Sequence, residues 1–288
     1  MESLREAKRR SNPVEQPGMK LRFGLVGCGA MGAVIARHLI ARWKGKARWT
    51  GFHDASEEAA RNLSAALGRR IPLRGLHELI SGSDWVVEAA SPSAVPVLLK
   101  LCLEKKKNLL AMSSGGLLKC SSLMKDARSR GIRIVVPSGA IAGLDTIQAA
   151  RLGTIDEAMI TTRKPPHAFR GAPHLLKMGM DPSALQKETV LFEGNAAQAM
   201  EGFPANINVA ATLSLATGLA ARKIRVKIVA DPAATRNTHH VIVRGSSGDI
   251  STTVDNVPSK TNPKTSALAV LAACVAIDGI FSSVRIGT

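Results

Sequence analysis

Three glycines near the start of the chain have the spacing of a phosphate-binding turn. Gly27, Gly29 and Gly32 form a G-x-G-x-x-G pattern between a predicted buried strand and a predicted helix. In such a turn the first glycine permits a tight bend, the second lets the backbone approach a pyrophosphate, and the third allows the helix to pack closely on the strand. The N–H groups at the start of the helix then bind the anion. The pattern predicts a dinucleotide site that includes Ala30 and Met31, with an empty glycine-rich turn as the alternative.

An acidic residue at the end of the next predicted strand supports this site. Asp54 lies 22 residues after Gly32, where a carboxylate accepts hydrogen bonds from the adenosine ribose hydroxyls. Because a carboxylate there repels a 2′-phosphate, Asp54 predicts NAD as the cofactor. Ser56 and Arg61 are close enough in the sequence that NADP stays an alternative.

Two short segments of small residues follow later predicted strands. Ala90 and Ser91 come after an apolar run at 85–89, and Ser113–Gly116 come after one at 108–112. Loops outside the carboxyl ends of parallel strands are where a dinucleotide lies in this type of sheet. Both segments therefore predict cofactor contacts, with room for a ribose, and an ordinary strand-to-helix turn is the alternative for each.

The elements that must position these residues alternate between strand and helix up to Pro137. Short apolar runs predict strands, and longer periodic segments predict helices. The alternation predicts an α/β fold in which residues 21–140 form a Rossmann domain, a doubly wound parallel sheet covered on both faces. The predicted strands are 21–27, 47–53, 71–73, 85–89, 108–112 and 132–136, and the predicted helices are 31–43, 56–67, 93–106 and 118–130.

After Pro137 several predicted strands follow one another without a helix between them. This pattern predicts a smaller α/β catalytic domain, residues 141–264, built on a mixed or antiparallel sheet. We expect the substrate cleft between the two domains and the C-terminal helix of residues 265–288 packed back on the first. The predicted strands are 158–162, 189–192, 224–230, 240–243 and 250–254, with a helix at 207–217.

The composition is that of a globular protein. The 288 residues are 45% hydrophobic, but no run reaches the roughly 18 to 20 apolar residues of a membrane span, and no signal-peptide core precedes the first strand. We expect a soluble, cytoplasmic protein that does not bind membranes. The four cysteines are far apart and form no C-x-x-C pair, so the sequence predicts buried, reduced thiols and no metal site.

The chain is strongly basic. Lysine and arginine number 39 against 22 acidic residues, for a net charge of +17. The basic residues are scattered, and six Phe and three Trp provide few stacking platforms, so a nucleic-acid partner is not predicted. The densest cluster, Lys8–Arg10, lies in residues 1–20, which we expect to form a flexible basic tail. The excess charge can instead draw a small anionic substrate to the cleft.

Several further segments, in order along the chain, are more specific than the glycine pattern. They read PSGAIAGLD at 137–145, KPP at 164–166, FPANINVA at 203–210, DP at 231–232, NTH at 237–239 and NPKTS at 262–266. Together with the glycine turn they resemble the L-aspartate dehydrogenase family from Leu21 to about Ile280.

The resemblance implies a Rossmann cofactor domain joined to an α/β catalytic domain. It also implies NAD(P)-dependent, reversible oxidative deamination of L-aspartate to iminoaspartate, and then to oxaloacetate and ammonia. The imine could alternatively feed quinolinate and hence NAD synthesis. The resemblance further implies a homodimer, cofactor contacts from Ala140 and Asn208, and an active-site role for His239.

A histidine suits the proton transfers of this reaction. The amine must be neutral before a hydride leaves the α-carbon, and hydrolysis of the imine needs an activated water, tasks that suit a group titrating near neutral pH. His239 and His240 are adjacent in a predicted strand, so their side chains should point to opposite faces and only one can face the cleft. Comparable context is lacking for His53, His77, His167 and His174.

A dicarboxylate substrate needs cations or N–H donors for two carboxylates. For each candidate a solvated side chain or a helix cap is the alternative. The candidates are Lys164, Lys264, Thr265 and Ser266, and Arg163 and Arg236 are further options that the sequence does not rank.

Two other functions stay open at this point. Dihydrodipicolinate reductase also has a His-His pair, but there a lysine-bearing segment ending in a Gly-Thr turn follows it, whereas residues 241–246 here read VIVRGS. A non-catalytic nucleotide sensor would keep the dinucleotide fold and bind a polyanion through its basic surface. The matched residues beyond the cofactor turn favour the enzyme.

Overall fold

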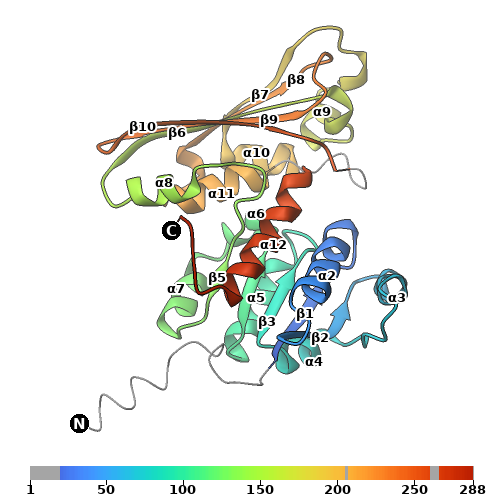
Figure 1. Cartoon of the computed structure of the whole chain (residues 1–288). Coiled ribbons are helices and arrows are strands. Elements are labelled where there is room, and N and C mark those ends of the chain that lie inside the picture. Colours follow the sequence, from blue (N-terminus) through green and yellow to red (C-terminus); the bar gives the residue numbers. More distant parts are fainter. Residues whose placement is uncertain (1–19, 205–206, 260–265, 288) are drawn as a thin grey trace, which may run out of the picture.

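The computed structural model describes residues 20–204, 207–259 and 266–287, which form two sheets with their helices (Figure 1). The predicted basic tail lies outside the described residues, apart from Lys20. The first sheet has the order β2-β1-β3-β4-β5, and every pair in it is parallel. Its strands are β1 (Leu21–Val26), β2 (Ala47–His53), β3 (Trp85–Glu88), β4 (Asn108–Ala111) and β5 (Ile134–Val135).

Helices cover both faces of this sheet because its strands are apolar on both sides. Trp85 and Val87 belong to one buried cluster, whereas Val86 between them belongs to the cluster on the other face. The reversal of strand order at β1 and β3 is that of a doubly wound sheet. The helices are α2 (Ala30–Arg42), α3 (Glu57–Ala66), α4 (Leu76–Gly82), α5 (Val95–Glu104), α6 (Ser114–Leu117) and α7 (Ser121–Ser129).

The second sheet has the order β10-β9-β6-β8-β7 and is mixed, with β6 and β8 parallel and the other pairs antiparallel. Helices α10 and α11 supply buried residues to its core and lie between it and the first sheet (Figure 1). The predicted fold class, a Rossmann domain followed by a smaller α/β domain with a mixed sheet, is confirmed. The strands are β6 (Ile155–Lys164), β7 (Thr189–Asn195), β8 (Ile224–Ala230), β9 (Asn237–Gly245) and β10 (Gly248–Asn256). The helices are α8 (Leu144–Ala150), η3 (Pro166–Phe169), α9 (Pro173–Lys177), η4 (Pro182–Ala184), α10 (Ala196–Gly202), α11 (Asn208–Thr217), η6 (Ala221–Lys223) and α12 (Ala267–Phe281).

Some predicted elements differ from the structure. The predicted strand 71–73 is wrong, because only Leu73 forms an isolated bridge, to Phe52, and Pro72 offers a carbonyl but no N–H for a ladder. The predicted helix 118–130 begins only at Ser121, and a separate short helix, α6, precedes it. Helices α4, α8, α9 and α10 were not predicted, since each has only five to seven residues and too few turns for a clear period.

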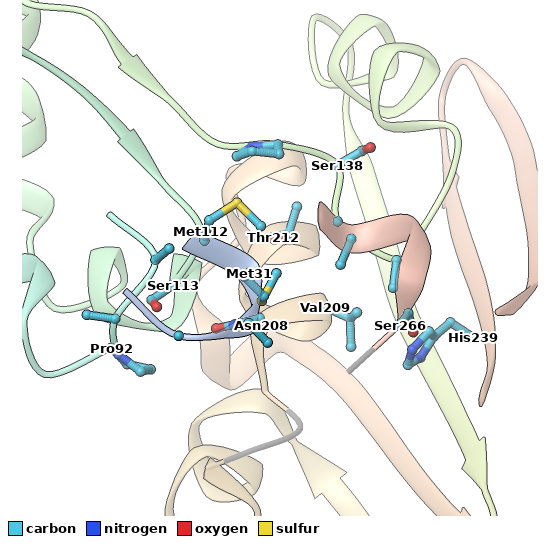
Figure 2. A pocket seen from close by; sticks show the side chains of 18 of the residues that line it. Met31, Pro92, Met112, Ser113, Ser138, Asn208, Val209, Thr212, His239 and Ser266 are labelled. Atoms are coloured by element: carbon cyan, nitrogen blue, oxygen red, sulfur yellow. The ribbon is translucent and has the colours of Figure 1, made fainter. Parts of the chain in front are cut away.

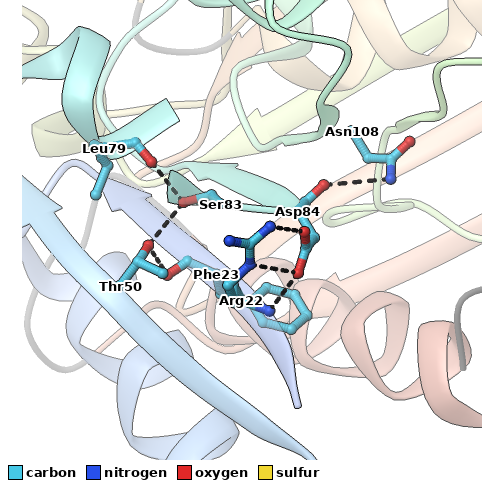
Figure 3. A network of polar contacts seen from close by, with 7 residues as sticks. All are labelled: Arg22, Phe23, Thr50, Leu79, Ser83, Asp84 and Asn108. Carbon is cyan, nitrogen blue, oxygen red and sulfur yellow. Dashed lines mark hydrogen bonds and ion pairs between the residues drawn. The ribbon is translucent and has the colours of Figure 1, made fainter. Parts of the chain in front are cut away.

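A polar network joins the strands at the end of the first sheet where they begin (Figure 3). The Arg22 guanidinium donates to both carboxylate oxygens of Asp84, at 3.1 and 2.6 Å. Asn108 Nδ2 donates to the Asp84 carbonyl at 3.3 Å, and Thr50 Oγ1 lies 2.7 Å from Ser83 Oγ. These contacts tie β1, β2, β3 and β4 together at one end and leave the loops at their carboxyl ends to form a site.

Helix α12 returns from the second sheet to pack on the first domain (Figure 1). Its Ala273 and Ile277 belong to the same buried cluster as Ile35 of α2. The Asp278 Oδ1 accepts a hydrogen bond from Trp43 Nε1 at 2.5 Å and lies 2.7 Å from His38 Nε2. The two halves are therefore joined by the chain twice, before α8 and before α12. Among the described residues, no helix is long and apolar enough to cross a membrane.

Replacing Asp278 tests how much this polar anchor contributes. We expect Asp278→Ala to lower the free energy of unfolding by about 1–3 kcal/mol, because the two ring nitrogens lose a partly buried acceptor. Urea unfolding measures the change. Asp249→Ala is the matched control, since its 3.3 Å ion pair with Arg244 is exposed and should change stability by less than about 0.5 kcal/mol. Equal effects of the two substitutions would contradict the anchoring role.

Candidate active site

One pocket of about 370 Å³ opens between the two halves of the molecule (Figure 2). Its wall from the first domain is made by the glycine turn and by the loops that follow β3, β4 and β5. Its wall from the second comes from β6, β9 and the starts of α11 and α12. Residues that line the pocket include Gly29, Ala30, Met31, Ala90, Pro92, Ser113, Ala140, Lys164, Asn208, Thr212, His239 and Ser266.

The three glycines of the turn are required for different reasons. Gly27 has a φ of 98°, which L side chains rarely adopt. A Cβ on Gly32 would lie 2.0 Å from the Gly27 carbonyl oxygen, so this position holds helix α2 against the turn. A Cβ on Gly29 would meet no atom within 4 Å, although Gly29 lines the pocket. The open space beside Gly29 therefore fits a group that approaches the backbone closely, as a pyrophosphate does.

Asp54 lies against the same turn. Its Oδ2 accepts a hydrogen bond from the Cys28 N–H at 2.7 Å, and its Oδ1 accepts one from the Ser56 N–H at 2.9 Å. Each oxygen keeps a second acceptor position, which suits ribose hydroxyls. The residues beside the turn thus fit a dinucleotide.

A buried carboxylate connects the loops that follow β3 and β4. Its role was not predicted from the sequence. Glu88 ends β3 and is fully buried. It accepts hydrogen bonds from the Ala90 N–H at 2.8 Å, the Ser113 N–H at 2.9 Å and the Ser113 hydroxyl at 2.9 Å. Burial raises the pKa of Glu88, and these hydrogen bonds oppose the rise. The one available signal was an acid in an otherwise apolar strand.

Hydrogen bonds of helix α11 connect the second half of the molecule to the first. The Asn208 Oδ1 accepts from the Gly115 N–H at 3.3 Å, and the Ser114 hydroxyl donates to the Asn208 carbonyl at 2.9 Å. Thr212 Oγ1 donates to Ser114 Oγ at 2.9 Å. Asn208 lines the pocket, and because its Oδ1 accepts from the backbone, Nδ2 is the second polar group of its amide.

The two glycines of segment 113–116 pack closely against neighbouring elements. A Cβ on Gly115 would lie 3.2 Å from Ile207 Cγ2, and one on Gly116 would lie 2.3 Å from the Pro92 carbonyl oxygen. The two glycines allow close packing of α11 and of the Pro92 loop, and Ser113 is the residue of this segment that lines the pocket.

The second sheet presents a histidine and a lysine to the pocket. His239 and Lys164 both line it and are only 3% and 4% exposed. His239 Nδ1 lies 3.0 Å from Thr162 Oγ1 on the neighbouring strand. His240 points to the other face of the sheet, where its Nε2 lies 3.0 Å from Ser251 Oγ. The prediction that only one of the adjacent histidines faces the cleft is confirmed.

Burial changes the protonation of both groups. Burial, and then the charge of Lys164, lower the pKa of His239 to about 3, so the imidazole is neutral at physiological pH. Burial also lowers the pKa of Lys164 to about 8. The lowered pKa takes His239 away from the near-neutral titration that suits these proton transfers, since an imidazolium would be buried beside an ammonium.

The other predicted site residues divide into three groups. Ala140 and Ser266 line the pocket, and the Ala140 carbonyl accepts a hydrogen bond from Asn256 Nδ2 at 3.0 Å. Ser91 does not line it, and its hydroxyl lies 2.9 Å from that of Ser93. Lys264 and Thr265 lie outside the described residues. All four cysteines are buried free thiols, as predicted.

The pocket has a glycine turn that fits a dinucleotide on one side, and a buried histidine and lysine on the other. This is the organisation of a two-domain, nicotinamide-dependent dehydrogenase. Residues 27–137 match the family described as homoserine dehydrogenase, NAD binding domain, and residues 145–280 match aspartate dehydrogenase, C-terminal. The chain is 40% identical over 272 residues to an L-aspartate dehydrogenase of Methanosarcina barkeri, and equally so to one of Methanosarcina acetivorans. Both alignments cover 93% of this chain and 100% of the relative.

A solved structure gives the same result. The crystal structure of an aspartate dehydrogenase from Thermotoga maritima superposes with a TM-score of 0.72 at 26% identity, and covers 93% of this chain and 100% of that chain. The chain belongs to the L-aspartate dehydrogenase family.

Two glycine substitutions separate cofactor binding from folding. We expect Gly29→Ala to leave the melting temperature unchanged, because its Cβ meets no protein atom, and to weaken NADH binding at least tenfold by occupying the phosphate space. Gly32→Ala should instead lower the melting temperature by several degrees, because its Cβ meets a backbone oxygen. Thermal unfolding and NADH fluorescence titration give the two quantities. Unchanged NADH affinity in Gly29→Ala would contradict the assignment of the turn.

Proposed function

We propose that this protein catalyses the reversible NAD(P)-dependent oxidative deamination of L-aspartate. The products are iminoaspartate and, after hydrolysis, oxaloacetate and ammonia. The observation that carries this proposal is the placement of His239 and Lys164 in one pocket with Gly29, Ala140 and Asn208. A base, a cation for a carboxylate and a dinucleotide turn are then within one enclosed space.

The first-domain wall, together with Asn208 of α11, would hold the dinucleotide. The glycine turn and the start of α2 would bind the pyrophosphate, and Asp54 would bind the adenosine ribose. Ala90, Ala140 and Asn208 would contact the nicotinamide end. When bound, the nicotinamide dinucleotide accepts the hydride from the substrate α-carbon. We propose NAD as the preferred form, because the Asp54 carboxylate beside the turn repels a 2′-phosphate.

His239 would move the protons. Its neutral imidazole can take a proton from the α-ammonium before oxidation and release it to solvent. The imidazole can then take a second proton from the water that attacks the imine carbon, and the imidazolium formed can protonate the departing amine, so that one group serves both steps. A substrate carboxylate beside Lys164 offsets the charge that helps to lower the pKa of His239, which makes the imidazole more basic when substrate is bound.

Lys164 would bind a substrate carboxylate. An ammonium with little exposure forms a strong charge-assisted hydrogen bond, because water competes weakly for it. The Ser266 hydroxyl, at the start of α12, can donate to the same ligand. Lys264 and Thr265 stay candidates from the sequence.

We further propose a cytoplasmic homodimer. Leu268, Leu271 and Val275 lie on one side of α12 and are 41–68% exposed, and burial of this apolar strip against a second copy would remove it from water. Iminoaspartate that leaves before hydrolysis would supply NAD biosynthesis.

A spectrophotometric assay tests the reaction. NAD and NADP are each offered with L-aspartate, D-aspartate, L-glutamate, L-alanine and L-homoserine. We expect reduction with L-aspartate alone, faster with NAD, and the reverse reaction with oxaloacetate and ammonia. Bound NADH without oxidation of any amino acid would overturn the substrate and leave the fold intact.

The two adjacent histidines provide a matched pair of variants. We expect His239→Ala to lower kcat about 100- to 10,000-fold, the range for loss of a general acid–base group, with NADH affinity within twofold of wild type. His240→Ala removes the imidazole from the opposite face and should retain near-normal kcat. Near-normal turnover in His239→Ala would refute its role.

The pKa of Lys164 predicts how dicarboxylate affinity depends on pH. Below about pH 8 the side chain is an ammonium, and above it the charge is lost, while succinate stays fully ionised. The Kd of succinate for the NADH complex should therefore be constant from about pH 6.5 to 7.5 and then rise by up to about tenfold per pH unit. Calorimetric titration measures it. Lys164→Arg should remove this dependence, because arginine keeps its charge, and a flat wild-type profile to pH 9.5 would exclude Lys164 from the site.

A further inference from the structure

The strand register places the polar side chains of the second sheet in two neighbouring rows. Thr162 pairs with His239 and Arg163 with Thr238 across β6 and β9, so the next position brings Lys164 opposite Asn237. Directly opposite residues, and residues two apart on a strand, share one face of a sheet. Asn237 and Lys164 therefore form a row beside the row of His239 and Thr162, on the face that borders the pocket.

The row extends onto the next strand. Asn237 pairs with Asn256 across β9 and β10. Asn256 Nδ2 donates to the Ala140 and Val254 carbonyls at 3.0 and 3.3 Å, which fixes this carboxamide. The row thus connects the pocket segment that contains Ala140 with the pocket lysine.

This row also contains unsatisfied polar atoms. In the part of the chain that the structure describes, the buried side-chain nitrogens and oxygens without a hydrogen-bond partner are Asn237 Nδ2, Asn237 Oδ1 and Asn256 Oδ1. Asn237 is fully buried. Leaving such groups unpaired is costly, so each exception in a native protein calls for an explanation, and a catalytic role is one. The three atoms belong to Asn237, opposite Lys164, and to Asn256 on the other side of Asn237.

We propose that Asn237 is a specificity-determining residue, whose carboxamide joins Lys164 in binding the substrate carboxylate farther from the reacting carbon. This inference rests on the proposed function. Asn237 itself does not line the pocket, and Cβ atoms of directly opposite residues are about 4.5–5.5 Å apart, so its carboxamide would reach a carboxylate that binds deep beside Lys164. Asn237 Oδ1 remains as an acceptor for the Lys164 ammonium.

The spacing of the two rows suits a four-carbon dicarboxylate. Residues two apart on a strand are separated by roughly 6.6 Å, and the amine and the distal carboxylate of aspartate are three bonds apart, so side chains that converge from the two rows can reach both ends of one substrate molecule. His239 then exchanges protons with the amine in one row, and Asn237 and Lys164 bind the distal carboxylate in the next row. A neutral amide beside the lysine leaves the row with a positive charge for that carboxylate, as an acid would not.

Two variants of Asn237 separate substrate binding from folding. Asn237→Leu has a similar size and removes the unsatisfied amide, so its free energy of unfolding should equal or exceed that of wild type. Asn237→Asp keeps the shape and adds a negative charge. The ligands are succinate, with two carboxylates, and butyrate, with one, titrated into the NADH complex. L-Aspartate and L-2-aminobutyrate form the corresponding substrate pair.

We expect Asn237→Leu to lose roughly 10- to 100-fold in succinate affinity, the range for a hydrogen bond to a charged group, and to keep its butyrate and NADH affinities. Asn237→Asp should lose more, and the preference for L-aspartate over L-2-aminobutyrate should fall in parallel. If the folded Asn237→Leu variant kept the wild-type affinity for succinate, or lost equal affinity for succinate and butyrate, the role of Asn237 would be overturned and the proposed function would stand. A wild-type enzyme that oxidises no L-aspartate would overturn the proposed function.

Discussion

The contact of the start of α11 with the Ser114 hydroxyl and the Gly115 N–H is the interaction on which the site depends. Neither half contains a complete pocket, because the glycine turn belongs to the first domain and His239 and Lys164 to the second. Asn208 and Thr212 bond to Ser114 and Gly115 across this boundary. A Cβ at Gly115 would lie 3.2 Å from Ile207 Cγ2, so a larger residue there would press against the start of α11, and glycine favours the close contact of the two walls.

Around this contact, each wall is held by polar groups of its own domain. Glu88 fastens the loops after β3 and β4 to each other, and Asp54 fastens the glycine turn to the end of β2. In addition, Asn256 of β10 donates a hydrogen bond to the Ala140 carbonyl, in the loop after β5. Because buried hydrogen bonds of this kind are costly to break, the pocket is shaped before ligands arrive. Binding energy can then be used for substrate discrimination rather than for ordering loops.

The electrostatics of the second wall follow from burial. Lys164 and His239 are enclosed so closely that both lose affinity for protons. In the proposed reaction, a substrate carboxylate beside Lys164 would offset the positive charge of the ammonium and so make the imidazole a stronger base. Recognition of the carboxylate and activation of the amine would then be coupled through two side chains on adjacent strands.

The sequence predicts the parts of the site that local structure determines. The glycine turn and Asp54 belong to one strand–turn–helix–strand unit, and the opposite directions of His239 and His240 follow from the alternation of a strand. Glu88, Thr162 and Asn237 were missed as functional residues because their roles depend on pairing between distant segments. Thr162 and His239, for example, are 77 residues apart. Helices α8 to α10 were missed since tertiary packing, not periodicity, maintains such short elements.

The most direct test of this account follows the hydrogen on the substrate α-carbon. L-[2-²H]Aspartate is oxidised with NAD, and the reduced cofactor is analysed by mass spectrometry and proton NMR. The account predicts one deuterium at C4 of the nicotinamide ring, on a single face, for each oxaloacetate formed. Reduced cofactor without deuterium, or oxaloacetate formed without reduction of cofactor, would contradict it.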